Sequence, residues 1–284
     1  MNNMLQKITD FIKKETVLTI ATALAVASAF WVHPGPQYVG YIDWRVLGIL
    51  LSLMLIVAGF QSNGLFDAIG SRLLAKTKNT AQLMLVLVFL CFFSSMFITN
   101  DVALLTFVPF ACTILQKCHQ ERLIVTTFVL QTLAANLGSM LTPVGNPQNL
   151  YLYSVSGAGL GEFIGWMAPY TLVSGVLLLL VVFVLSAGKR RISLETGALL
   201  QTSGAAGRKK NGIYLALFVL SLLSVARVLP WELMLAVVLI VLIFTDRAVF
   251  LQVDYCLLFT FISFFIFIGN MGNIEAVRSV LQSL

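Results

Sequence analysis

The chain has 284 residues, of which 59% are hydrophobic and 11% are charged, and this leaves too little polar surface for a soluble fold. Its net charge of +6 comes from basic clusters between apolar segments, without the aromatic-interleaved basic face that a nucleic-acid partner needs. The composition instead predicts an all-α polytopic membrane protein with about seven spans, each of about 20 residues, and one hydrophobic hairpin.

Apolar runs of membrane-span length alternate with polar or basic loops along the chain. The first span is predicted near 17–31 and the second near 44–60, and an amphipathic surface helix within 61–79 follows them. Later spans are expected at 163–186, 212–228, 231–245 and 254–269. The predicted domains are a cytoplasmic N-terminal segment at 1–16, a first transmembrane repeat at 17–188 and a basic cytoplasmic loop at 189–210. A linking span at 211–230 and the start of a second repeat at 231–284 follow.

Two apolar arms within the first repeat, 80–98 and 102–116, are separated only by Thr99-Asn100-Asp101. They fit a re-entrant hairpin over 80–116, although two complete spans joined by a polar turn also fit. Asp101 is the one ionisable residue expected inside the membrane, where such a group is costly and indicates function. The N–H groups at the start of the second arm attract an anion, and the carbonyls that end the first arm suit a small cation.

A second interruption lies in the helix predicted over 123–155. Residues 142–149 hold two prolines, one glycine and two asparagines within an otherwise apolar segment. Non-helical backbone at membrane depth persists only where it is buried in protein or lines a cavity. The segment is therefore either the break in a discontinuous helix or an ordinary extramembranous loop. Paired broken elements near the midplane are typical of the substrate sites of secondary transporters.

The distribution of basic residues predicts the orientation. With the N-terminus cytoplasmic and the hairpin returning to its own side, all of the 18 Lys and Arg residues except Arg45, Arg227 and Arg278 lie inside. All 4 tryptophans then fall at the outer interface, where their amphipathic rings anchor. We therefore expect a multi-pass protein of the plasma (inner) membrane with a cytoplasmic N-terminus.

A faint internal repeat relates the two ends of the chain. Ile42-Asp43-Trp44 matches Val253-Asp254-Tyr255, and in the predicted topology the two copies cross the membrane in opposite directions. Chance similarity between apolar helices is one explanation, and an inverted-topology repeat is the other. The second explanation predicts an inverted-repeat secondary transporter with a re-entrant hairpin and a broken helix, whose second repeat is incomplete at Leu284.

Two motifs carry a resemblance to a known family. They read Ser95-x-x-x-Thr99-Asn100-Asp101-x-Ala103-Leu104-Leu105-x-x-x-Pro109 and Asn136-x-Gly138-Ser139-x-x-Thr142-Pro143-x-Gly145-Asn146-Pro147-x-Asn149. Together they resemble the ion-transporter superfamily of arsenite permeases, Na⁺/H⁺ antiporters and citrate or divalent-anion carriers. The resemblance implies an inverted-repeat fold with a re-entrant hairpin and a broken helix in each half.

The resemblance also implies roles for single residues. The implied cation site consists of Ser95, Thr99, Asn100 and Gly145. The implied substrate contacts are Asn100, Asp101, Asn146, Thr142 and Asn149. Asp101 departs from the neutral threonine of the dicarboxylate carriers and is closer to the arsenite-permease and antiporter branches. Because an ionised carboxylate would repel an anionic substrate, Asp101 is expected to act as a proton or cation relay.

The expected function is a secondary active permease for a small inorganic or carboxylate anion, driven by a proton or Na⁺ gradient through alternating access. The alternatives are a Na⁺/H⁺ antiporter using Asp101, a non-transporting truncated fragment and one subunit of a split carrier. An intramembrane enzyme would need paired catalytic groups, so no enzymatic activity is predicted. No cofactor or resident metal is expected beyond the coupling H⁺ or Na⁺. The expected partners are the anion, the lipid bilayer, and a second copy or a missing C-terminal half.

Overall fold

The computed structural model describes residues 6, 9–10, 12–74, 77–186 and 205–274, and these residues form helices joined by turns and short loops. The chain divides into two units. Met1–Leu51 and Gln252–Leu284 form the first unit, and Ser52–Leu251 form the second. Most of the segment predicted as a basic loop, and the last ten residues of the predicted second repeat, lie outside the described residues.

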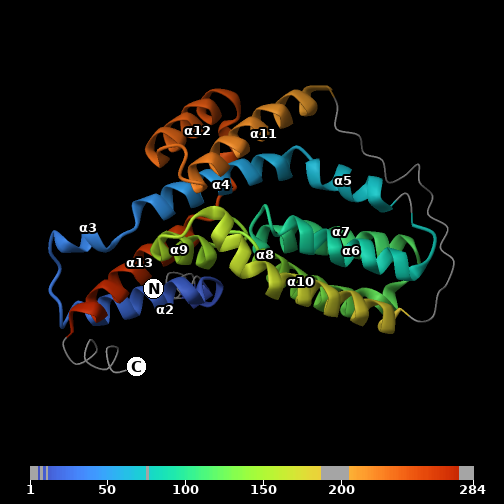
Figure 1. Cartoon of the computed structure of the whole chain (residues 1–284), viewed down its shortest axis with the longest axis horizontal. Coiled ribbons are helices and arrows are strands. Elements are labelled where there is room, and N and C mark those ends of the chain that lie inside the picture. Colours follow the sequence, from blue (N-terminus) through green and yellow to red (C-terminus); the bar gives the residue numbers. More distant parts are fainter. Residues whose placement is uncertain (1–5, 7–8, 11, 75–76, 187–204, 275–284) are drawn as a thin grey trace. The chain divides into compact units, whose positions relative to one another are not determined.

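In the first unit two helices from opposite ends of the sequence lie side by side (Figure 1). They are α2, Thr16–Ser28, and α13, Tyr255–Asn273. The amide of Asn270, fully buried on α13, donates hydrogen bonds of 2.9 Å to the hydroxyls of Ser28 and of Tyr38, which belongs to the short α3, Gln37–Tyr41. Polar side chains therefore join the N-terminal and C-terminal parts of this unit.

The two similar sequence segments begin helices in the same way. Asp43 precedes α4, Trp44–Ser62, and its carboxylate accepts a hydrogen bond of 3.0 Å from the Val46 N–H. Asp254 precedes α13, and its carboxylate accepts one of 3.2 Å from the Leu257 N–H. Each aspartate is an N-cap that satisfies a free donor of the first helical turn. The inverted topology of a whole repeat stays a prediction.

The second unit contains a helical hairpin at the two predicted arms and an interruption at the predicted break, and their depth in the membrane stays a prediction. Its helices after α4 are α5 Leu65–Leu74, α6 Thr80–Ser94, α7 Asn100–Lys117, α8 Ile124–Ser139, α9 Pro147–Ser156, α10 Leu160–Leu185, α11 Ala205–Val225 and α12 Trp231–Thr245, with short 3₁₀ turns at Glu121–Leu123 (η1) and Arg247–Leu251 (η3). Helix α8 contacts both arms of the hairpin, α6 and α7, and also α10, and α11 lies against α12 (Figure 1). Helix α11 begins at Ala205, so the end of the predicted basic loop is helical.

A buried apolar cluster holds the two hairpin arms together at the end away from their turn. It consists of Leu74, Leu83, Leu87, Ala111, Ile114, Leu115 and Cys118. Leu83 and Leu87 lie one turn apart on α6, and Ile114 and Leu115 lie on the facing end of α7. This packing fixes the two arms relative to each other at the end away from their turn.

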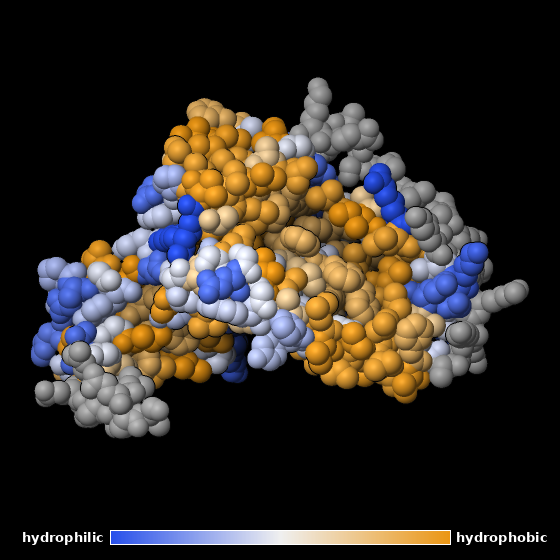
Figure 2. Space-filling model, in the orientation of Figure 1, coloured by the Kyte–Doolittle hydropathy of each residue, from blue (hydrophilic) through white to orange (hydrophobic). Residues whose placement is uncertain are grey.

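Three described helices are long and apolar enough to cross a membrane: Trp44–Ser62, Leu160–Leu185 and Tyr255–Asn273. Four further apolar helices are shorter, including α2, whose 13 residues rise only about 20 Å against a hydrocarbon core of about 30 Å. Hydrophobic residues cover much of the face in view in Figure 2, as expected of helices that contact lipid. The chain is an all-helical, polytopic membrane protein.

Candidate functional site

The hairpin turn brings an acidic residue to the first turn of a helix. Helix α6 ends at Ser94, and α7 begins at Asn100 directly after Thr99, whose backbone is extended at φ −62° and ψ 148°. Asn100 and Asp101 therefore belong to α7 and not to the connection that the sequence predicts. Asp101 is exposed in the first turn, where the N–H groups and helix dipole favour negative charge.

The broken helix is interrupted over a shorter stretch than predicted. Helix α8 ends at Ser139, and α9 starts at Pro147, so the break covers residues 140–146. The Asn146 side chain caps α9 by accepting a hydrogen bond of 2.7 Å from the Asn149 N–H. A proline at the first helical position costs nothing, because the N–H it lacks has no helical acceptor there.

Asn149 donates hydrogen bonds to three carbonyls at the break. Its Nδ2 donates to the carbonyl oxygens of Ser139, Met140 and Thr142 at 3.2, 2.9 and 3.2 Å. The helical donor for the Ser139 carbonyl would be the residue four positions on, Pro143, which has no N–H. Asn149 is only 7% exposed, and its amide hydrogens point into the break. It closes the C-terminal end of α8 from the first turn of α9.

We expect Asn149→Ala to destabilise the fold by about 1–3 kcal/mol, the cost of leaving buried carbonyls unsatisfied. The measurement is the apparent melting temperature of the purified chain in detergent. Gln148→Ala is the matched control, because Gln148 is the exposed neighbour on the same turn of α9. Equal melting temperatures for the two variants would show that Asn149 does not hold the break together.

Two hydrogen bonds join the hairpin turn to the break, and a third joins α7 to α8. The Asn100 N–H donates to the Gly145 carbonyl at 3.0 Å, and the Asn100 Nδ2 donates to Asn136 Oδ1 on α8, also at 3.0 Å. The Thr142 hydroxyl donates to the Met96 carbonyl and accepts from the Gly145 N–H at 3.2 Å. Two segments that are some 40 residues apart in sequence therefore form one site.

Two glycines permit this approach. A Cβ atom at Gly138 would lie 2.1 Å from the Phe92 carbonyl oxygen and 2.7 Å from Ser95 Oγ. A Cβ atom at Gly145 would lie 2.2 Å from the Ser139 carbonyl oxygen. Real Cβ contacts are not that short, so a side chain at either residue would force backbone apart. Gly138 sets the distance between α8 and the end of α6.

The electrostatics of the site follow from its four helix ends. The N-termini of α7 and α9 carry partial positive charge, and the C-termini of α6 and α8 carry partial negative charge. The bond from Asn100 to Gly145 places both kinds of end together. Such an arrangement can hold an anion on N–H groups beside a small cation on carbonyl and hydroxyl oxygens.

The residues expected to bind a cation surround the turn. Ser95 is fully buried and donates to the Phe92 carbonyl at 2.9 Å, Thr99 is 9% exposed, and Gly145 is buried. A cavity of about 10 Å³ lies beside Thr99, which is close to the smallest volume that holds a water molecule. Its other lining residues are apolar, so this cavity lacks the oxygen ligands that a cation needs.

The residues expected to contact substrate differ in how much hydrogen-bonding capacity they keep. Asn100 and Asn146 are half-buried, and Asp101 is exposed. Thr142 and Asn149 are engaged with backbone groups of the turn and the break. The structure places all five in the same region but gives them different surroundings.

Three side chains support the site in addition to the predicted binding residues. Asn136 contacts Asn100 directly. Gln131, fully buried on α8, donates to the carbonyls of Leu87 on α6 and Phe107 on α7, both at 3.2 Å, and so fixes both arms of the hairpin. A glutamine inside an apolar run is the signal that indicates such a role.

The third is Arg227, in the turn between α11 and α12. Its guanidinium donates to the carbonyls of Gly157 at 3.0 Å and Tyr153 at 3.2 Å and lies 5.0 Å from the centre of the Tyr153 ring. A cation is favoured there, because these carbonyls end α9. Helix α9 is therefore capped by Asn146 at one end and Arg227 at the other.

Comparison with known proteins gives a consistent result. The sequence profile of the citrate transporter family (CitMHS) matches residues 8–284. Inner membrane protein YbiR of Escherichia coli is 31% identical over 267 residues, which are 92% of this chain and 68% of that protein. An uncharacterised transporter of Methanocaldococcus jannaschii is 30% identical over 242 residues, which are 84% of this chain and 63% of that protein.

A more distant similarity covers part of the chain. The transporter arsB of Dictyostelium discoideum is 27% identical over 130 residues, which are 45% of this chain and 23% of that protein. The chain thus spans about two thirds of the length of the first two relatives and less than a quarter of this one.

Proposed function

Because the chain belongs to the citrate transporter family, we propose that it is a secondary active permease for a small anion, of the carboxylate or inorganic class. The family and the named relatives are transporters and not enzymes. The proposed driving force is a proton or Na⁺ gradient, and the proposed mechanism is alternating access around the site formed by the hairpin turn and the break.

The observation that carries this proposal is the hydrogen bond of 3.0 Å between the Asn100 N–H and the Gly145 carbonyl. It brings two helix N-termini and two helix C-termini to one place inside a membrane protein. Free N–H groups at such ends bind anionic groups, and unwound carbonyls bind the coupling cation in many secondary transporters. The site therefore has a partner for each of the two charges that a symporter moves.

The roles proposed for single residues follow from their surroundings. Asn100 and Asn146 contact the substrate, with Asn136 beside Asn100 as a further polar group, and Asp101 at the same site relays the coupling proton or cation. Ser95, Thr99, Asn100 and Gly145 hold the cation. Thr142 and Asn149, implied as substrate contacts by the resemblance, are instead proposed to hold the break in shape.

In the proposed orientation the chain spans the plasma (inner) membrane and its N-terminus lies in the cytoplasm. The positive-inside rule supports this orientation, because it places all Lys and Arg residues except Arg45, Arg227 and Arg278 on the cytoplasmic side. Accessibility of single cysteines introduced at Thr99 and Asp101 to a bulky, membrane-impermeant reagent tests one part of it. Labelling of both from the outer solution would favour a complete span over a re-entrant turn.

A direct test uses the chain reconstituted in liposomes with radiolabelled citrate outside. We expect an inward proton or Na⁺ gradient to drive accumulation, and an ionophore that collapses that gradient to stop it. Unlabelled succinate and arsenite serve as competitors that separate the carboxylate class from the inorganic class. Citrate uptake that is identical with and without each gradient would rule out coupled transport.

A Na⁺/H⁺ antiporter is the second candidate function. It is favoured by Asp101, an exposed carboxylate in the first turn of α7 and the one acidic residue of the site. The same liposomes answer this question when they contain a pH-sensitive dye. In an antiporter, internal protons leave as added Na⁺ enters, so the interior of the liposomes becomes alkaline. Such alkalinisation, unaffected by citrate, succinate or arsenite, would favour the antiporter.

A further inference from the structure

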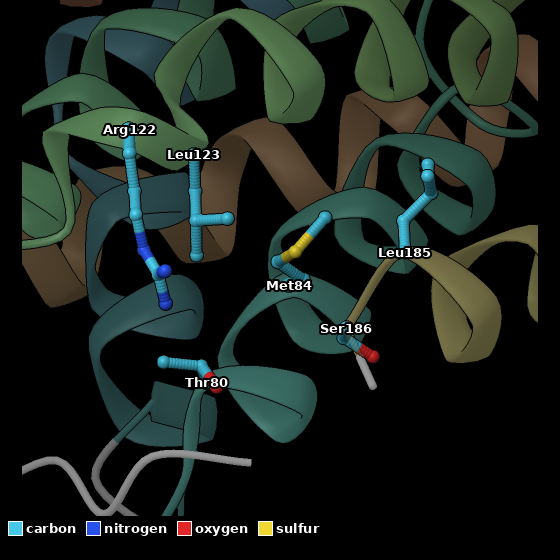
Figure 3. A pocket seen from close by; sticks show the side chains of 6 residues that line it. All are labelled: Thr80, Met84, Arg122, Leu123, Leu185 and Ser186. Atoms are coloured by element: carbon cyan, nitrogen blue, oxygen red, sulfur yellow. The ribbon is translucent and has the colours of Figure 1, made fainter. Parts of the chain in front are cut away.

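A cavity of about 170 Å³ opens at the end of the second unit opposite the hairpin turn. It is lined by Thr80, Met84, Arg122, Leu123, Leu185 and Ser186 (Figure 3). These residues come from the start of α6, the η1 turn before α8, and the end of α10. Since an apolar cavity of about 150 Å³ accommodates benzene, this one has room for a phosphate-sized group.

The lining combines one cation, two hydroxyls and apolar walls. Arg122 extends along the cavity with its guanidinium toward Thr80, and Ser186 lies across the cavity from it (Figure 3). The Ser186 hydroxyl donates to the Val182 carbonyl at 2.6 Å. Met84, Leu123 and Leu185 provide the apolar surface. No carboxylate is among the six lining residues. The arginine fork matches the oxygens of a phosphate group, which it can bind through two parallel hydrogen bonds.

The charge of the surrounding helix ends favours an anion. Lys78, which is exposed, lies just before α6. The positive end of the α6 dipole is at Thr80. The negative end of α10 is near Ser186 and opposes an anion, but a helix end carries only about half of a unit charge. The full charge of Arg122 outweighs it.

Exposed apolar side chains cover most of α10, including the part next to this cavity. Val181, Val184 and Leu185 are 43%, 73% and 51% exposed, and they occupy successive positions on one face of the helix. A free phosphate ion does not bury these apolar side chains, whereas the acyl chain of a lipid covers them. Basic pockets between membrane helices on the cytoplasmic side bind anionic headgroups in this way.

The geometry points to a binding site for the phosphate group of an anionic phospholipid, with Arg122 as its principal ligand. The headgroup lies in the cavity, and an acyl chain lies along α10. This lipid holds the start of α6, the η1 turn and the end of α10 together. It thereby stabilises the end of the hairpin that lies farthest from the proposed transport site.

The test measures the apparent melting temperature of the delipidated chain in detergent during titration with lipid. Phosphatidylglycerol is expected to raise it, and phosphatidylcholine and inorganic phosphate at the same concentration are not. Arg122→Gln should raise the half-maximal phosphatidylglycerol concentration by about fivefold, the value of one basic residue near a membrane surface. Arg122→Lys, which keeps the charge, should recover most of the affinity.

Lys117→Gln is the matched control, because it removes one exposed charge at the same end of the unit without lining the cavity. It should leave the titration unchanged. A loss as large as that of Arg122→Gln would show diffuse attraction to a basic surface and would overturn the site. An equal response to phosphatidylcholine would overturn the preference for anionic lipid. An equal response to inorganic phosphate would identify free phosphate, and not lipid, as the occupant.

Discussion

Replacement of Gly138 by alanine is expected to lower the apparent melting temperature and to abolish coupled uptake. Alanine is a better helix former than glycine by about 1 kcal/mol, which alone would stabilise α8. At this position, however, the new Cβ would lie 2.1 Å from the Phe92 carbonyl oxygen, and backbone cannot rotate away as a side chain does. Overpacking of this kind costs about 1–3 kcal/mol, so the clash prevails.

The functional loss has a separate cause. To relieve the clash, α8 must move away from the end of α6, and Asn136 moves with it. The hydrogen bond of 3.0 Å between Asn136 and Asn100 then lengthens or breaks, and the turn loses its contact with the helix beside it. Uptake of labelled citrate into liposomes and thermal unfolding in detergent measure the two effects on one preparation.

Gly165→Ala provides the control for this prediction. Gly165 lies inside α10, is exposed, and has no atom within 4 Å of the position that a Cβ would take. The helix-propensity gain should therefore appear there without any cost, as a melting temperature equal to or above that of the unchanged chain. If Gly138→Ala behaved like Gly165→Ala, the close approach of α6 and α8 would not be required.

Interruptions of helices could be predicted from the sequence because they depend on local chemistry. Two prolines, a glycine and two asparagines in an apolar run identify the break between α8 and α9, and Thr99-Asn100-Asp101 identifies the hairpin. The helix predicted over 231–245 has those bounds, since Pro230 precedes it and Asp246 ends it. Signals of this kind lie within a few residues of the feature they determine.

The boundaries within the two interruptions could not be predicted as well. The turn of the hairpin lies at 95–99 and includes Phe97 and Ile98, whose apolar side chains suggest that the first arm continues. The restart of α9 at Pro147 depends on Asn146 as its cap, although the same residues also suit a longer loop. Both boundaries are set by tertiary contacts, among them the bond between Asn100 and Gly145.

The residues that support the site from a distance were the hardest to predict. Gln131 acts on Leu87 and Phe107, and Arg227 acts on Tyr153 and Gly157, some 70 residues earlier in the chain. A polar residue in an apolar helix can be recognised in a single sequence, but the residue with which it forms a hydrogen bond cannot. The packing of α8 against both hairpin arms supplies that information.

Asp101→Asn is expected to reduce gradient-driven accumulation to the level of empty liposomes while the chain stays folded. Asp101 is exposed in the first turn of α7, beside Asn100, and no other acidic residue belongs to the site. Asparagine keeps the size and the hydrogen-bonding reach of the side chain but cannot take up and release a proton or neutralise a cation. Asp101→Glu keeps the carboxylate and should retain part of the coupling.

Glu162→Gln separates the coupling role from a general effect of charge. Glu162 is an exposed acidic residue in the first turn of α10, so each variant removes one negative charge from a helix N-terminus at a cost of about 0.3–1 kcal/mol. The two variants should unfold at similar temperatures, and only Asp101→Asn should lose accumulation. Normal coupling in Asp101→Asn would mean that the proton or cation is carried by another group, and the backbone oxygens around Thr99 and Gly145 would then have to hold it without a carboxylate.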